Sequence, residues 1–348
     1  MALFRRIVWL LVAVAALAGA QSTFHLKALA RIPGAEVAVV MDMNEARLSG
    51  DLSDIQGNIG GPGEKLDFSA VRKYRTVEEI LGDPDLEAVD ICLPTNLHAP
   101  AAIEALRAGK HVLVEKPMAL DGHSADRMTA EAQKHGRLLM TAQVVRFIPS
   151  YRGLAELVRS GRLGAVRSAI FRRRCAAPTW GPWEFDSSQS GGGVFDLLIH
   201  DVDICQYLFG VPEAICALGH EDMPRGIDSI VAHFHYPHIG SVVITGGWHH
   251  IGAYPFSMEY TVVADGGAVE YNSAGRPAAF YTADGKTELL PSPEQDWYQS
   301  EIEYFLECVS AGRQPEFCPP EESARAVKLA RIMLESRDRK GEKIACNL

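Results

Sequence analysis

The sequence lacks the cysteine spacing of a disulfide-rich or zinc-binding protein. Its seven cysteines are scattered, their number is odd, and no two of them form a Cys-x-x-Cys pair. This distribution favours reduced thiols over a disulfide framework or a zinc cluster. We therefore predict no metal site, and we expect most of the cysteines to pack as small apolar side chains in the core.

A surplus of positive charge is missing as well. The 348 residues include 34 lysines and arginines against 44 aspartates and glutamates, so the formal net charge is −10. Such an acidic chain is poorly suited to hold a phosphate backbone, and we expect no nucleic acid partner. Hydrophobic residues make up 47% and charged residues 22%. This balance is typical of packed globular proteins, and the length suggests two domains.

A stable membrane span is not expected either. The apolar run at 7–17 is shorter than the roughly 20 residues that a confident span needs. Because Arg5 and Arg6 precede this run and Ala18-Gly19-Ala20 follows it, the pattern resembles a cleaved signal peptide. On this segment alone, export with removal of residues 1–20 is one interpretation.

The other interpretation is a buried strand over residues 10–15. Parallel strands that are covered on both faces are continuous apolar runs. A helix-like stretch at 22–32 follows, and a second apolar strand at 36–41 then ends at Asp42. Strand, helix, strand and acidic residue form the pattern of a dinucleotide-binding unit. The pattern favours a retained strand and a cytoplasmic protein, with export as the alternative.

Strands and helices alternate up to about residue 145, which predicts an α/β domain with a Rossmann-type, doubly wound parallel sheet. Beyond it, extended stretches separated by turn signals such as Asp265-Gly266-Gly267 predict an α+β domain with a large open, mostly antiparallel sheet. We assign residues 1–145 to the nucleotide-binding domain and 146–348 to a substrate and oligomerisation domain. The last helix, at about 321–337, is expected to pack back towards the first domain.

The tripeptide Glu115-Lys116-Pro117 stands at the carboxyl end of a predicted strand. Ligands of doubly wound sheets bind beyond those ends. A proline here can enforce a sharp turn through a cis bond. Such a turn would direct Lys116 into the crevice as a positive charge and hydrogen-bond donor. A solvated charge pair before a turn is the alternative.

A second cluster follows three glycines, Gly191 to Gly193, in a predicted helix. Asp196 and His200 are four residues apart and share a helical face, with Asp203 close to it. A carboxylate beside an imidazole sets its tautomer and raises its basicity, which suits removal of a proton from an alcohol. A helical ion pair, with Asp203 as a structural hydrogen-bonding residue, is the alternative.

Two further strand ends carry polar residues. Thr95 and Asn96 follow an apolar strand and can hydrogen-bond a ribose or a carboxamide, although Asn96 also suits the N-cap of the next helix. Asp42 suits the two hydroxyls of an adenosine ribose and would repel a 2′-phosphate. This favours NAD as the cofactor, with NADP as the alternative.

From about residue 13 to 335, the chain resembles the glucose–fructose oxidoreductase / inositol dehydrogenase / MocA family. The residues that carry the resemblance are His25 to Leu29, Pro33 to Val37, Pro94 to His98, Ala108 to Pro117, Arg146 to Pro149, and Gly191 to Gly193 with Asp196, His200 and Asp203. The resemblance implies hydride transfer between NAD(P) and a secondary alcohol or ketone of a sugar, cyclitol or related polyol. It implies cofactor contacts from Ala18, Gly19, Asp42, Thr95, Asn96, His98, Glu115 and Lys116.

The resemblance also implies Lys116, Asp196 and His200 as the catalytic set. His200 would take the hydroxyl proton, Asp196 would support the imidazolium, and Lys116 would stabilise the developing alkoxide. We expect the site at the interface of the two domains and a homo-oligomer, dimer or tetramer, that covers the open sheet. Four residues are candidates for the sugar pocket, with simple packing as an equal alternative: Arg146, Trp180, Trp183 and Tyr298.

The family's Gly-x-Gly-x-x-Gly turn is degenerate in this chain. Counting back from His25 puts its glycine positions on Ala16, Ala18 and Gln21, with Gly19 between them. Glycines there allow close approach of the backbone to a pyrophosphate, so weaker dinucleotide binding is expected. A sensor or binding protein with impaired cofactor binding is therefore an alternative function. A redox-assisted glycosidase that holds NAD tightly is another.

Overall fold

The computed structural model describes residues 10–15, 20–57, 63–178, 182–250, 252 and 254–348. The chain forms two compact units. The first comprises Met1–Ala119, His123–Ala142 and Asp296–Glu321, and the second comprises Leu120–Gly122, Gln143–Gln295 and Glu322–Leu348. The two units are therefore not consecutive in the chain.

The first unit is built on a six-stranded sheet in the order β3-β2-β1-β4-β5-β6. Every pairing between these strands is parallel. This is the order of dinucleotide-binding sheets, in which the direction of winding reverses between β1 and β4. The predicted Rossmann-type sheet is confirmed. Its strands are β1 Leu10–Ala15, β2 Ala35–Met41, β3 Arg72–Tyr74, β4 Ala88–Ile91, β5 His111–Glu115 and β6 Leu139–Ala142.

β1 lies at the centre of this sheet and pairs with both β2 and β4. Its residues form the continuous apolar run that a strand covered on both faces requires, and Val12 and Val14 are buried. The interpretation of residues 10–15 as a buried strand is confirmed. The segment that resembles a signal peptide thus supplies the strand that joins the two halves of the sheet.

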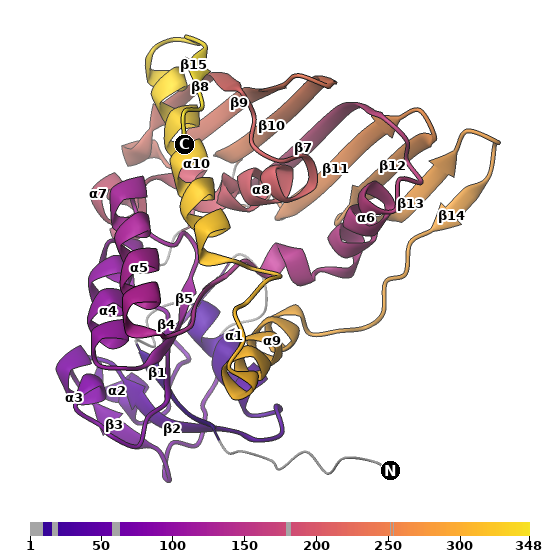
Figure 1. Ribbon diagram of the computed structural model, residues 1–348. Helices are drawn as coiled ribbons and strands as arrows, with labels where there is room; N and C mark the ends of the chain where they lie inside the picture. Colours follow the sequence, from indigo (N-terminus) through magenta and orange to yellow (C-terminus); the bar gives the residue numbers. More distant parts are fainter. Residues whose placement is uncertain (1–9, 16–19, 58–62, 179–181, 251, 253) are drawn as a thin grey trace, which may run out of the picture. The chain divides into compact units, whose positions relative to one another are not determined.

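Helices cover both faces of the six-stranded sheet (Figure 1). α1 (Ala20–Leu29) packs beside α9 (Trp297–Ala311). α3 (Val77–Leu81), α4 (Thr95–Arg107) and α5 (Gly122–His135) lie on the opposite face. The short α2 (Glu45–Leu48) follows β2. Parallel sheets need such cover because their strands are apolar on both faces.

The second unit is built on a nine-stranded sheet in the order β14-β13-β12-β11-β7-β10-β9-β8-β15. β7 and β10 pair in parallel, and the other described pairings are antiparallel. The predicted mostly antiparallel sheet is confirmed. Its strands are β7 Val166–Ala176, β8 Ala214–Asp222, β9 Ile227–Tyr236, β10 Ile239–His250, β11 Ser257–Ala264, β12 Gly267–Asn272, β13 Arg276–Thr282, β14 Thr287–Leu289 and β15 Ile344–Ala345.

One face of this sheet is covered by α8 (Gly193–Phe209), which packs on β7, β9 and β10 (Figure 1). The strand register places four apolar side chains together on the opposite face. They are Ile170, Leu218, Val231 and Val263, with exposed fractions between 41% and 61%. This face of the sheet is therefore open and partly apolar.

The second unit also contains α6 (Pro149–Arg159), α7 (Ser187–Ser190) and most of α10 (Pro320–Asp338). Its described residues include the 3-10 helices η1 (Val144–Phe147), η2 (Pro182–Phe185) and η3 (Met223–Arg225). Among the residues that the structure describes, no helix combines the length and the apolar character that a bilayer crossing requires.

Candidate functional site

The carboxyl ends of the parallel strands gather the predicted cofactor residues of the first unit. Asp42 follows β2, Thr95 and Asn96 follow β4, and Glu115 and Lys116 lie at the end of β5. Carboxyl ends of parallel strands meet at one edge of a sheet, and this edge is where doubly wound folds bind nucleotides. The topology therefore brings these five residues to the same edge.

Asp42 is nearly buried at this edge, with an exposed fraction of 7%. Its Oδ1 accepts a hydrogen bond of 2.7 Å from the backbone N–H of Asn44, and its Oδ2 lies 3.8 Å from Nη1 of Arg47. The carboxylate is thus held in a fixed orientation. A fixed carboxylate at the end of the second strand suits the diol of an adenosine ribose.

Asn96 does not cap α4 as its position suggested. The N-cap of that helix is Pro94, which makes no side-chain capping hydrogen bond. The Oδ1 atom of Asn96 is buried and has no hydrogen-bond partner among the described residues. A buried oxygen without a partner is costly unless a ligand or water satisfies it. This orphaned acceptor fits a site that receives a hydrogen-bonding ligand.

Lys116 stands in a turn whose backbone is held on both sides. The Lys116–Pro117 bond is cis, in agreement with the prediction. The backbone N–H of Lys116 donates to Oε2 of Glu115 at 2.9 Å. The carbonyl oxygen of Pro117 lies 2.8 Å from Nδ1 of His98. The side chain of Lys116 is itself partly exposed.

His98 is buried, and both ring nitrogens lie against backbone carbonyl oxygens. Nδ1 contacts Pro117, and Nε2 lies 2.7 Å from the oxygen of Leu93. The imidazole joins the two loops that follow β4 and β5. This arrangement favours a structural role over the direct cofactor contact that the resemblance implies.

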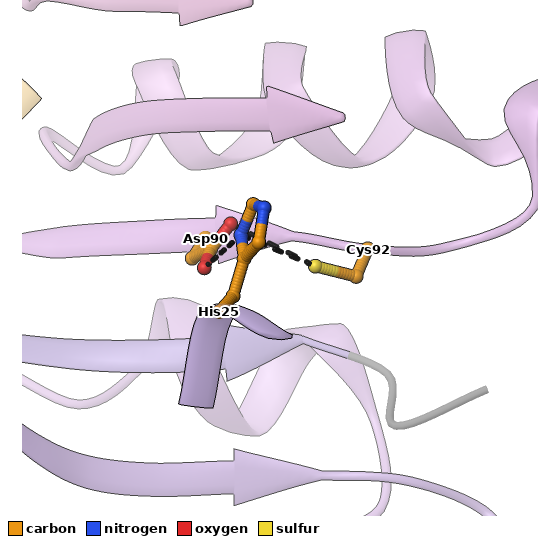
Figure 2. Close-up of side chains that lie close together, drawn as sticks. All are labelled: His25, Asp90 and Cys92. Carbon is orange, nitrogen blue, oxygen red and sulfur yellow. Dashed lines mark hydrogen bonds and ion pairs between the residues drawn. The ribbon is translucent and has the colours of Figure 1, made fainter. Parts of the chain in front are cut away.

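His25, Asp90 and Cys92 form a buried cluster (Figure 2). His25 of α1 is fully buried, and its Nδ1 lies 2.8 Å from Oδ2 of Asp90. Its Nε2 lies 3.1 Å from Oε1 of Glu115. Cys92 Sγ lies 3.8 Å from His25 Nδ1 and 3.8 Å from Asp90 Oδ1. Burial disfavours the imidazolium, but the contacts with Asp90 and Cys92 together outweigh burial and raise the pKa of His25 well above its usual value.

Glu301 of α9 is fully buried near this cluster. Neither of its carboxyl oxygens has a hydrogen-bond partner among the described residues. Burial and the nearby Glu115 and Asp90 carboxylates raise the pKa of Glu301 well above its usual value, although His25 opposes the shift. We therefore expect this side chain to be uncharged at neutral pH.

In the second unit, the predicted catalytic residues Asp196 and His200 lie one turn apart on α8. Asp196 is partly exposed in the first turn, and His200 has an exposed fraction of 8%. Lys116 belongs to the other unit. The joint action of the three side chains on one substrate stays a prediction.

Glycine and a buried carboxylate define the start of α8. Gly192 has a φ of +92°, which favours glycine. A Cβ on Gly193 would lie 2.3 Å from the ring of Trp248. Oδ2 of Asp228 accepts the backbone N–H of Val194 at 2.8 Å. The glycine stretch thus serves close packing of the helix start, and Asp228 holds its first turn.

Two buried ion pairs hold α8 at positions after His200. Arg173 of β7 pairs with Asp201, Nε to Oδ2, at 2.8 Å. Arg146 of η1 pairs with Asp203 at 2.7 Å and with Glu322 at 2.7 Å. Arg146 is fully buried, which favours a structural role over the predicted contact with a sugar. Asp203 is the structural residue that one interpretation of the sequence expected.

The remaining predicted residues are dispersed. Tyr298 of α9 stacks on Phe24 of α1, with ring centroids 4.7 Å apart, in the first unit. Trp183 is partly exposed in η2 of the second unit. Trp180, Ala18 and Gly19 lie outside the described residues.

The start of α1 shows where the residue at the motif's third glycine position lies. Gln21 is partly exposed, whereas the neighbouring Ser22 is fully buried. The third glycine of the motif serves close packing of the helix on the sheet. Because Gln21 is partly exposed, its side chain is not buried between α1 and the sheet.

Comparison with known proteins places the chain in a family. The oxidoreductase family with an NAD-binding Rossmann fold matches residues 12–143, and the GFO/IDH/MocA C-terminal domain matches residues 151–270. The chain therefore belongs to the glucose–fructose oxidoreductase / inositol dehydrogenase / MocA family, as its sequence motifs predicted.

Individual relatives support this assignment. An uncharacterised oxidoreductase of Bacillus subtilis, YrbE, is 25% identical over 332 residues, which cover 92% of each chain. The myo-inositol 2-dehydrogenase of Thermotoga maritima is 30% identical over 193 residues, 55% of this chain and 53% of that protein. With several such relatives, the match spans about half of the relative's length.

The fold agrees with solved structures of the same kind. Levoglucosan dehydrogenase in complex with NADH superposes with a TM-score of 0.81 over 97% of this chain and 99% of that chain, at 19% identity. At that identity, the similarity establishes the fold and nothing finer.

Proposed function

We propose that the protein is an NAD-dependent oxidoreductase that acts on a secondary alcohol or ketone of a sugar, cyclitol or related polyol. The single observation that carries the proposal is the six-stranded sheet, whose nucleotide-binding edge carries Asp42, the orphaned oxygen of Asn96 and the lysine of Glu115-Lys116-Pro117. Family membership supports the reaction class. The names of relatives such as myo-inositol 2-dehydrogenase support the substrate class.

The residues at the sheet edge fit the cofactor. Asp42 would bind the adenosine ribose, and Thr95 and Asn96 would bind the ribose or carboxamide of the nicotinamide half. NAD, when bound, accepts or donates the hydride, which is chemistry that the protein side chains cannot supply. The carboxylate of Asp42 favours NAD over NADP because a 2′-phosphate would meet a fixed negative charge.

Three side chains would remove the proton of the alcohol and stabilise the negative charge that develops on its oxygen. His200 takes the hydroxyl proton as general base, and Asp196, one turn away, supports the imidazolium that forms. Lys116 donates a hydrogen bond to the substrate oxygen as negative charge develops there. Acid–base help of this kind is typically worth about 10²–10⁴-fold in rate.

The proposal extends to assembly and location. The open, partly apolar face with Ile170, Leu218, Val231 and Val263 supports a homo-oligomer, a dimer or tetramer, that covers it. The central position of β1 supports retention of residues 10–15, and with it a cytoplasmic location.

A His200→Ala variant tests the assignment. We expect turnover of a panel of polyols with NAD to fall by at least about 10²-fold, while the affinity for NADH, measured by its fluorescence, stays within a factor of about two. Unchanged turnover would reject His200 as the base. Lost NADH binding would instead indicate that His200 supports the cofactor site.

A catalytically silent sensor on the same fold is the second candidate. The observation that favours it is the glycine-poor sequence after β1, where Gly19 is the single glycine from residue 16 to 24. Titration with NAD(H) and NADP(H) separates the two candidates. Absence of binding at millimolar concentrations would favour the sensor.

A further inference from the structure

The fully buried His25 is joined to the backbone of Lys116 by a chain of two contacts. Nε2 of His25 lies 3.1 Å from Oε1 of Glu115, and Oε2 of the same carboxylate accepts the N–H of Lys116 at 2.9 Å. Each oxygen of Glu115 therefore has its own partner. Rotation of the Glu115 side chain would break both contacts.

The opposite side of the imidazole is anchored as well. Nδ1 of His25 lies 2.8 Å from Oδ2 of Asp90 in β4. Nδ1 hydrogen-bonds Asp90, whereas Nε2 faces Glu115 as an ion-pair contact without hydrogen-bond geometry. A protonated imidazole is attracted by both carboxylates. Burial opposes ionisation of Glu115, but the contacts with His25 and Lys116 together outweigh it and lower the pKa of this carboxyl. The three groups thus form a buried carboxylate–imidazolium–carboxylate row.

Donor atoms of His25, Asp90 and Cys92 also lie within 4.8 Å of one another, which resembles a metal site (Figure 2). One observation favours the charged row. His25 Nδ1 lies at hydrogen-bonding distance from Asp90, closer than the thiol sulfur at 3.8 Å.

We propose that His25 is a positioning residue for Lys116 and acts through Glu115. The imidazolium fixes both the charge and the rotamer of Glu115, and Glu115 fixes the backbone from which the Lys116 side chain projects. This inference rests on the proposed function for its kinetic consequence. Its structural content, the link from His25 to Lys116, stands independently of the reaction.

The first test is a double-mutant cycle. We expect His25→Gln to lower kcat roughly 10- to 100-fold, as small misplacements of a reacting group do, with NADH affinity changed less than about threefold. In a Lys116→Met background, which has already lost the amine, His25→Gln should lower kcat by less than about twofold. An equal loss in both backgrounds would overturn the proposal, because it would show that His25 acts elsewhere.

Two further variants test whether the effect of His25→Gln is specific. His238→Gln makes the same change at an exposed histidine between β9 and β10 and should leave kcat unchanged. Glu115→Gln keeps an acceptor for the Lys116 N–H but removes the charge that faces His25. It should reproduce the His25→Gln loss, and adding His25→Gln to it should cost little more. If His25→Gln does not fold, the effect of Glu115→Gln on kcat is compared in the wild-type and Lys116→Met backgrounds instead. An equal loss in both backgrounds would again overturn the proposal.

A measurement without turnover separates failure of this inference from failure of the proposed function. After reductive ¹³C-methylation, the NMR signal of Lys116 is identified by its loss in Lys116→Met. We expect His25→Gln to change the pH titration of that signal and to leave other lysines unchanged. An unaltered Lys116 signal would overturn the link even if the protein has no dehydrogenase activity. Stoichiometric zinc in the purified protein, lost in Cys92→Ser, would overturn the charged row in favour of a metal site.

Discussion

Arg146 and Asp203 form a doubly hydrogen-bonded pair, with Nε–Oδ2 and Nη2–Oδ1 distances of 2.7 Å each. The exposed fractions of the two side chains are 0% and 1%. The pair connects η1 with α8, the helix that carries Asp196 and His200. The pair is therefore one of the buried contacts that hold the helix of the proposed base in the second unit.

Arg146→Met should destabilise the protein by about 3–5 kcal/mol, because removing one partner leaves the Asp203 carboxylate buried without its charge partner. Equilibrium unfolding in urea measures the change. The matched control is Arg167→Met, which breaks an equally short pair with Asp265 whose side chains are 61% and 51% exposed. Exposed pairs contribute about 0–1 kcal/mol. Equal losses in both variants would contradict the role assigned to burial.

Removal of residues 1–20 should abolish folding of the first unit. The truncation deletes β1, so β2 and β4 each lose their neighbour and the sheet is divided. Hydrogen exchange should show loss of protection in β2, β4 and β5, while β7 to β11 of the second unit keep theirs. A truncated chain that binds NADH like the full chain would contradict the structural role of β1.

Much of the first unit could be predicted from its sequence, because parallel strands that are buried on both faces are continuous apolar runs. The predicted strand at 10–15 has the observed bounds, and a strand ends at Glu115-Lys116-Pro117 as predicted. β3, at Arg72–Tyr74, was missed because it is short, charged and at the sheet edge. The short edge strand β14 of the second unit was missed for a similar reason. β13, which pairs on both sides, was missed as well.

The site was only partly predictable because its contacts join distant residues. His25 and Asp90 are 65 positions apart, and they meet because β4 lies beside β1 in the sheet. One signal was present in the sequence: Asp90 interrupts an otherwise apolar strand, and a buried carboxylate needs a partner. Nothing in the sequence indicated that Arg146 would form a buried ion pair with Asp203.

Asp42→Ala should change the cofactor preference. Loss of hydrogen bonds from a charged group to the ribose should weaken NADH binding roughly 10-fold or more. NADPH binding should weaken less or improve, because the charge that opposes its phosphate is gone. Fluorescence titration with both nucleotides measures the ratio. The control Asp67→Ala, at an exposed loop position, should leave the ratio unchanged, and an unchanged ratio in Asp42→Ala would refute the ribose assignment.

The lowered pKa of His111 predicts that the protein loses stability in mild acid. Burial, and then the charge of Arg137, lower the pKa of His111 to about 4 in the folded state, against about 6.5 in the unfolded chain. Above the unfolded value both states are neutral, so the contribution is fully present. As pH falls from about 6.5 to 4, His111 binds a proton in the unfolded chain but not in the folded protein, and the free energy of unfolding decreases.

His111→Asn removes this titration and keeps an acceptor for the backbone N–H of Leu138, which His111 Nδ1 accepts at 3.0 Å. Because the imidazole is partly exposed, we expect the variant to lose about 1–2 kcal/mol less than the wild type between pH 7 and 4.5. Urea unfolding at the two pH values measures the difference. Identical losses would show that His111 does not contribute.

Hydride transfer itself can be followed with a polyol that carries deuterium on its carbinol carbons. With NAD and the wild-type protein, mass spectrometry of the reduced nucleotide should find one deuterium per molecule on the nicotinamide ring, and the His200→Ala variant should produce almost none. Reduced nucleotide without deuterium, or none at all from a broad panel of sugars and cyclitols despite saturating NAD, would contradict the account.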